Sequence, residues 1–234
     1  MPAVALKASP MVIGSADKFD EATAAIRKRV PVKRDEWDTL TTEEREHAFT
    51  VSNVTEMRVL QDVLDGVDRA IDQGSTLDEF KDEIASDLIE SWGGEIPGRI
   101  ETIFRTNILT SYAEGRHAIN SAPAVKEARP FWRFDEVADD RECEVCADCS
   151  GVVLPADDPF WSDHHPPLHF NCRCTVTALS PDEAADEGID EAGPDVDADE
   201  GFGEEPSAEG KDWEPDLSGL DPDLRAALEE RLAR

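Results

Sequence analysis

The chain has few basic residues. Its 234 residues include 23 lysines and arginines against 54 aspartates and glutamates, which gives a formal net charge of −31. Sequence-independent binding of nucleic acid depends on lysine and arginine contacts to phosphates. The charge balance therefore disfavours a protein that coats DNA or RNA. It suits instead a soluble chain, a basic partner or a high-salt environment.

The sequence also lacks long apolar runs. No stretch of about 18 apolar residues is present, so we expect no membrane-spanning helix. The first residues do not combine a basic start with an apolar stretch, so we expect no signal peptide either. In a protein that is not secreted, the five cysteines are expected to be reduced and to bind metal rather than form disulfides.

Helical periodicity dominates the first half of the chain. It predicts helices over 18–29, 42–48, 54–73, 76–92 and 97–120. Asn53 with Glu56 and Thr76 with Glu79 have the spacing of capping boxes, and Gly74 is a C-terminal stop. Gly115 inside the last helix costs about 1 kcal/mol relative to alanine, which close packing against another backbone would explain.

The period changes near residue 130. Pro130 to Phe134 alternates in the manner of a strand, with Phe131 and Arg133 on one side. Residues 152–154 and 172–179 are predicted to be further strands. Because side chains i and i+2 share a face of a strand, Cys172 and Cys174 would point at the same metal ion while Arg173 points away.

The composition shifts again near residue 180. Residues 181–210 contain 13 acidic residues and no basic one, which predicts a disordered acidic segment. Leu220, Leu224, Leu228 and Leu232 then recur at every fourth position. They predict a short amphipathic helix that is marginal alone. Two interpretations stay open: a weakly formed terminal helix, or a docking peptide for a partner.

The predicted fold class is α+β, with a helical region, a small zinc-stabilised β-region and a disordered acidic C-terminal tail. The predicted segments are a flexible N-terminus at 1–17, the helical region at 18–122, the Cys/His β-region at 123–179, the acidic linker at 180–219 and the C-terminal helix at 220–234.

The β-region holds all five cysteines and three of the five histidines between Cys143 and Cys174. A Cys-x-x-Cys pair that faces a second Cys/His group is typical of a tetrahedral zinc site. The candidate ligands are Cys143, Cys146, His169, Cys172 and Cys174. The first two form the most secure pair, and the last three compete for the remaining positions. Cys149 is expected not to take part, and His164 and His165 are expected to be loop residues.

A site closed by four protein ligands is structural, because it leaves no position for a catalytic water. A nucleobase deaminase would need Glu two residues after its histidine, where this chain has Ile119 after His117. An iron–sulfur cluster at Cys143, Cys146 and Cys149 is a minor alternative. A metal-dependent nuclease or hydrolase using His164, His165 and His169 stays open, although the acidic charge argues against it.

Two segments carry a resemblance to a known family. They are Asp140-Arg141-x-Cys143-x-x-Cys146-x-x-x-x-Gly151 and Pro166-Pro167-Leu168-His169-x-Asn171-Cys172-Arg173-Cys174. Together they resemble the head morphogenesis domain of phage Mu F-like minor head proteins. Weaker similarity extends upstream, so that the resemblance covers residues 18–179 and leaves out the tail.

The resemblance implies a minor capsid protein of a tailed phage or prophage that assists procapsid assembly near the portal. The implied partners are the portal and the capsid or scaffold proteins, with packaged DNA as a further candidate and no membrane. The implied location is the interior of the procapsid or virion, after assembly in the host cytoplasm. The family implies no catalysis and a structural zinc ion held by the Cys/His residues. A DNA-associated virion protein is an alternative.

Overall fold

The computed structural model describes residues 19–45, 47–51, 54, 56–92, 98–139, 141, 143–206, 217, 220 and 222–232. The predicted flexible segment at 1–17 lies outside these residues. The chain divides into two compact units, which are described separately: a helical unit at Asp17–Ser121 with Pro206–Arg234, and a β-unit at Ala122–Glu205. The mixture of helices with a small sheet agrees with an α+β fold.

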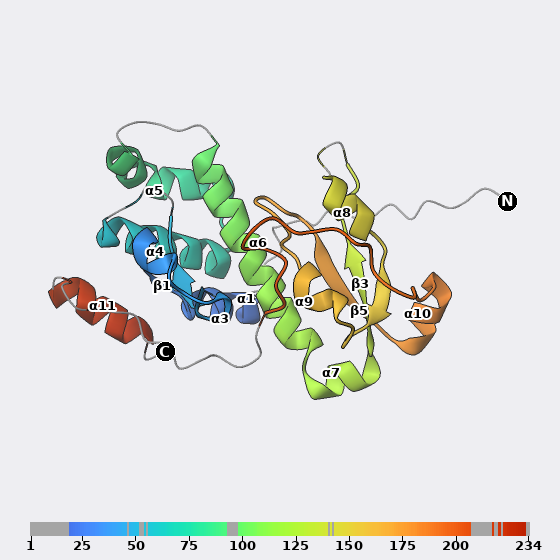
Figure 1. Ribbon diagram of the computed structural model, residues 1–234. Helices are drawn as coiled ribbons and strands as arrows, with labels where there is room; N and C mark the ends of the chain where they lie inside the picture. The colour runs from blue at the N-terminus through green and yellow to red at the C-terminus, as the bar shows by residue number, and fades with distance from the viewer. Residues whose placement is uncertain are drawn as a thin grey trace. The chain divides into compact units, whose positions relative to one another are not determined.

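The helical unit is built mainly from α1 (Asp20–Arg27), α4 (Met57–Gln73), α5 (Leu77–Trp92) and α6 (Arg99–Asn120), shown in Figure 1. Its short elements are β1 (Val30–Pro31), α2 (Arg34–Trp37), α3 (Thr42–Arg45) and β2 (Ala48–Phe49), with β1 and β2 paired in parallel. The buried core lies between the long helices and includes Ile26, Leu60, Leu64, Val67, Phe80, Phe104 and Ile108. No helix in the described part of the chain is apolar and long enough to cross a bilayer.

Helix caps follow the predicted chemistry where the structure describes them. Gly74 ends α4 in a left-handed conformation, with φ of 68°. The Thr76 hydroxyl accepts a hydrogen bond from the Glu79 N–H at 3.3 Å, and the Glu79 carboxylate accepts one from the Thr76 N–H at 2.7 Å. This is the predicted capping box of α5. The predicted box at Asn53 falls on a residue outside the description, and α4 begins at Met57.

Gly115 lies where α1 crosses α6. A Cβ built on Gly115 would stand 2.6 Å from the backbone nitrogen of Ala22, so no other residue fits without moving α1. This close approach confirms the predicted reason for a glycine inside the helix. The ion pair between Arg29 and Glu114 lies beside the crossing and is mostly buried.

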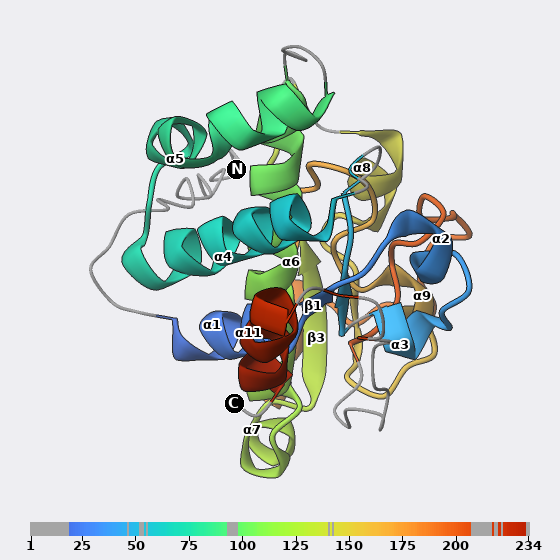
Figure 2. The same cartoon turned by 90° about the vertical axis from the view of Figure 1, so that its left-hand side faces the viewer.

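The C-terminal helix α11 (Pro222–Leu232) packs on the same unit. It lies against β1 (Figure 2). Its Leu224 and Leu228 are buried. A helix is therefore present within the segment predicted at 220–234, and its leucine repeat contacts this chain. Leu220 is half-buried, whereas the side chain of Leu232 lies outside the described part.

The β-unit is organised around a three-stranded antiparallel sheet of order β4-β3-β5. Its elements are α7 (Pro123–Ala128), β3 (Phe131–Asp135), α8 (Glu144–Cys149), β4 (Val153–Pro155), α9 (Phe160–His164), β5 (Thr175–Leu179) and α10 (Pro181–Glu187). Trp132 and Phe134 of β3 are fully buried and their neighbours are half-buried, which confirms the predicted alternation. Trp132 and Trp161 pack edge to face at 5.6 Å between ring centroids and form the centre of the core.

The structure differs from the predicted disordered linker at 180–219. Ser180 and Glu183 form a capping box with Pro181 at the first helical position, and α10 follows beside β5. The carboxylates of α10 meet arginines of the β-unit, because Glu183 binds Arg129 and Glu187 binds Arg133. These ion pairs anchor an acidic helix that composition alone marks as disordered.

After α10, residues 188–205 form an extended strap along the β-unit. Its backbone is joined to the loop before the cysteines through the pairs Asp199 N to Leu168 O, Gly203 N to Pro167 O, His165 N to Gly203 O and Glu205 N to Ser162 O. Val196 and Ala198 face the core, whereas Asp195, Asp197 and Asp199 are exposed. Residues 195–199 alternate with period two, which turns Val196 and Ala198 toward the core and leaves the carboxylates between them in solvent.

Gly203 is the residue on which the end of the strap depends. Its φ is 87°, and a Cβ there would stand 2.3 Å from the carbonyl oxygen of Asp163. We expect Gly203→Ala to release the strap, because the alanine is strained by its φ and also collides with a backbone atom. Hydrogen–deuterium exchange of residues 199–205 measures the release.

Gly201→Ala is the matched control. Gly201 has a similar φ of 84° but nothing within 4 Å of its Cβ position, so this variant shows the strain without the collision. Equal exchange in the two variants would contradict the docked strap.

Candidate metal centre

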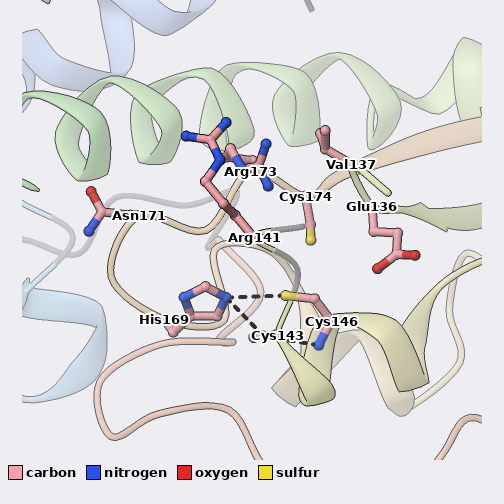
Figure 3. Close-up of a pocket in the computed structure, with 9 residues that line it drawn as sticks. All are labelled: Glu136, Val137, Arg141, Cys143, Cys146, His169, Asn171, Arg173 and Cys174. Carbon is pink, nitrogen blue, oxygen red and sulfur yellow. Dashed lines mark hydrogen bonds between the residues drawn. The ribbon is translucent and has the colours of Figure 1, made fainter. Parts of the chain in front are cut away.

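Two short segments bring the predicted ligands together. Cys143 is the N-cap of α8, where its sulfur accepts a hydrogen bond from the Cys146 N–H at 3.3 Å, and Cys146 lies in the first turn of that helix. His169 belongs to a loop, and Asn171 turns the chain with a φ of 61° just before Cys172. Asparagine tolerates this left-handed conformation better than most residues. Figure 3 shows Cys143, Cys146, His169 and Cys174 around one hollow.

The ligand atoms stand at distances that fit a metal ion. The His169 Nε2 lies 3.2 Å from the sulfur of Cys143 and 3.2 Å from that of Cys146, and the sulfurs of Cys146 and Cys172 are 3.9 Å apart. In a tetrahedral zinc site with Zn–S of about 2.3 Å, two sulfurs lie about 3.8 Å apart and a sulfur and a nitrogen about 3.5 Å. The residues present therefore fit a tetrahedral ion after small shifts.

His169 directs its Nε2 toward the sulfurs of Cys143 and Cys146. Its Nδ1 lies 2.8 Å from the carbonyl oxygen of Phe170, which can only accept a hydrogen bond. The proton is thus on Nδ1, and Nε2 offers a lone pair to the two sulfurs. A second hydrogen bond that fixes the tautomer in this way is usual for histidine ligands.

The five candidates form two overlapping groups. Cys143, Cys146 and His169 make one, and Cys146, Cys172 and Cys174 make the other, with all ligand atoms of a group within 4.8 Å of one another. Cys146 is the shared member. The structure thus places all five predicted ligands in two groups that are joined at the sulfur of Cys146.

The predicted strand at 172–179 is wrong at its start. The strand β5 begins at Thr175, so Cys172 and Cys174 lie in irregular backbone before it. Arg173 does not point away from the site as predicted, because it lines the same hollow (Figure 3). The turn at Asn171 and the pairing of Arg173 explain the difference, since both hold this segment out of the sheet.

The thiols influence one another strongly. The hydrogen bond between Cys146 and Cys172 lowers the pKa of Cys172 and raises the pKa of Cys146, because one thiolate is stabilised by the proton of the other. A bound cation would replace these protons and favour the thiolate at each ligand. Burial raises the pKa of Cys149 to about 11, and Cys149 belongs to neither ligand group.

His164 and His165 take no part in either group. His164 is the last residue of α9 rather than a loop residue, which corrects the prediction. Its Nδ1 lies 3.1 Å from the carbonyl oxygen of Phe160, and its Nε2 lies 2.7 Å from that of Val196 in the strap. His165 is buried, and its Nδ1 lies 3.1 Å from the carbonyl oxygen of Pro166. Both histidines therefore have ring nitrogens within hydrogen-bonding distance of backbone carbonyl oxygens.

Asp139 is a residue of the site that the sequence reasoning missed. Both of its carboxylate oxygens accept hydrogen bonds from the Arg173 guanidinium, at 2.6 and 2.7 Å. This hydrogen bonding from Arg173 holds the pKa of Asp139 well below its ordinary value. The stabilisation is therefore present at neutral pH and is lost as the pH falls through the acidic range. An Asp 34 residues before an Arg has no local sequence signal.

Comparison with known proteins places the chain in a family. The family model described as Phage Mu protein F like protein matches residues 61–177, which include all five candidate ligands. The chain belongs to this phage Mu protein F-like family.

Two curated relatives are similar to part of the chain. The putative capsid assembly protein F of Escherichia phage Mu is 36% identical over 152 residues, which are 57% of this chain and 34% of the relative. The Mu-like prophage FluMu F protein of Haemophilus influenzae is 32% identical over 146 residues, 57% of this chain and 35% of the relative. The chain thus matches about a third of the length of each. No solved structure matches it.

We expect Asp139→Asn to loosen the segment from Leu168 to Val176, because Arg173 loses its charged partner between two candidate ligands. Hydrogen–deuterium exchange of this segment is expected to rise. Asp157→Asn removes the same charge from an exposed position in the unit and serves as the control. If both variants leave exchange unchanged, the pair does not hold the segment.

Proposed function

We propose that the chain is a minor capsid protein of a tailed phage or prophage that assists procapsid assembly near the portal without catalysing a reaction. The observation that carries this proposal is membership of the phage Mu protein F-like family. The similarity to the putative capsid assembly protein F of phage Mu supports it. The partners on this proposal are the portal and the capsid or scaffold proteins, and the place of action is the procapsid or virion interior.

The Cys/His centre holds one structural zinc ion on this proposal. Cys143, Cys146 and His169 provide three ligands, and Cys172 or Cys174 provides the fourth. All four positions are then filled by the protein, so the ion stabilises the fold and has no place for a reacting water. The ion would add a bond that the apolar core does not supply, because it would join α8 to the irregular segment before β5.

A metal-dependent hydrolase at the histidines is the rival function. It needs at least two of His164, His165 and His169 at one ion. Both nitrogens of His164 face backbone carbonyls, and neither His164 nor His165 shares a ligand group with His169. The net charge of −31 also disfavours a nucleic-acid substrate. These observations favour the assembly role.

The zinc centre makes a quantitative prediction. Protein purified under reducing conditions is expected to contain about one zinc ion per chain. Cys146→Ala is expected to lose the metal, because Cys146 belongs to both ligand groups. Cys172→Ala and Cys174→Ala are expected to weaken it less, because each can replace the other. Metal analysis and competition with a chelator measure these effects.

Cys149→Ala is the matched control for the same experiment. Cys149 is fully buried in the same core but lies outside both groups, so its loss removes a thiol without removing a ligand. Full zinc content in Cys146→Ala, or loss of zinc in Cys149→Ala, would contradict the proposed ligands.

The assembly role is tested by complementation of a phage or prophage that lacks this gene. We expect the deletion to block the formation of filled heads, and the wild-type chain to restore them. His164→Gln is expected to restore them as well, because His164 lies outside both ligand groups and glutamine keeps a side-chain amide that can bond a backbone carbonyl. Heads that form normally without the gene would contradict the role, and failure of His164→Gln together with detectable hydrolysis by the wild type would favour the hydrolase.

A further inference from the structure

One aromatic side chain of the candidate metal centre faces solvent. Phe170 is 62% exposed, although it lies between two candidate ligands, His169 and Cys172. Its carbonyl oxygen accepts the hydrogen bond from His169, which fixes its backbone. One exposed phenylalanine alone would need no explanation, but a fixed backbone and a second ring beside it make this position a candidate contact surface.

The strap provides a second ring beside it. Phe202 packs edge to face on Phe170, with ring centroids 4.9 Å apart and an interplanar angle of 76°. The turn that carries Phe202 is closed by its N–H bond to the Asp199 carbonyl, and the Asp199 N–H is bonded to the Leu168 carbonyl. The aromatic pair therefore joins two segments whose backbones are tied together.

The surroundings of the pair are acidic. Residues 188–205 contain eight aspartates and glutamates and no basic residue. Asp199, Glu200 and Glu204 are exposed and stand within three positions of Phe202. Since the Asp199 and Phe202 backbones meet in one turn, exposed carboxylates lie next to the half-buried ring of Phe202, which packs on the exposed ring of Phe170.

We propose that the Phe170–Phe202 pair and its flanking carboxylates bind an arginine-rich segment of a partner protein. Arginine fits both parts of this surface. Its planar guanidinium stacks on an aromatic face, and its fork of N–H groups pairs with carboxylates in a bidentate manner. Lysine pairs with the carboxylates only as a point charge. The surface thus selects arginine over lysine, beyond general attraction to a positive chain.

Other occupants fit less well. The phosphates of a nucleic acid would be repelled by the carboxylates around the rings. A second copy of this chain would bring a second acidic strap against the first. The proposal names a partner surface in addition to the assembly role, and it does not need the partner to touch the ion.

The test uses the full chain, with its metal content measured, and two synthetic peptides. One peptide carries arginines alternating with alanines, and the other has lysines at the same positions. Isothermal titration calorimetry is expected to give tighter binding of the arginine peptide. Phe170→Ala is expected to weaken that binding about tenfold, the size of effect expected for a cation–π contact with its packing.

Three further variants make the result specific. Ile189→Ala removes another exposed apolar side chain of the β-unit, 47% exposed, and is expected to leave binding unchanged. Phe202→Ala is expected to weaken binding, as is the double change Asp199→Asn with Glu200→Gln. Equal affinity for the two peptides, with no effect of Phe170→Ala, would overturn the proposal and leave only charge attraction. Self-association that disappears in Phe170→Ala would overturn it in favour of a second copy.

The metal content of each variant separates this proposal from the zinc centre. If Phe170→Ala keeps its metal and loses arginine selectivity, the surface is supported independently. If the wild type holds no metal and still selects the arginine peptide, the zinc proposal fails while the surface stands.

Discussion

The β-unit depends on the meeting of α8 and the loop before β5 at the sulfur of Cys146. That sulfur lies 3.2 Å from the imidazole of His169 and 3.9 Å from the sulfur of Cys172, so it touches both ligand groups. Both segments also contribute to the apolar core around Trp132 and Trp161, through Cys146, Leu168 and Cys172. These sulfurs and the imidazole bond one another. A bound cation would replace the protons that they share.

Around Cys146, different interactions fix the other candidate ligands. The cap of α8 orients Cys143, the Phe170 carbonyl sets the tautomer of His169, and the Asp139–Arg173 pair holds the segment between Cys172 and Cys174. The helical unit relies on a different constraint, the close crossing of α1 over α6 at Gly115. At this crossing the two helices approach closely because Gly115 has no side chain.

Local signals in the sequence predicted much of this molecule. The alternation around Trp132, the cap at Thr76, the stop at Gly74 and the spacing of the cysteines each depend on residues within a few positions of one another. The pairing of Asp139 with Arg173 depends on the tertiary fold and has no such signal. The capping box at Ser180 did have one, the Ser-x-x-Glu pattern with proline at the first helical position. The acidic composition predicted disorder instead, because composition does not distinguish the positions that face solvent from those that face the core.

The strap has a consequence for how this chain can vary. Its exposed carboxylates contact solvent, so most of them can be exchanged for other polar residues without disturbing the fold. The inward positions have no such freedom. Gly193 lies against the ring of Phe160, Gly203 against the backbone at Asp163, and Val196 and Ala198 against the core. Related chains that keep this strap should therefore vary in charge at positions 195 and 197, which lie outside the proposed arginine-binding surface, while the small and apolar positions 193, 196, 198 and 203 stay nearly constant.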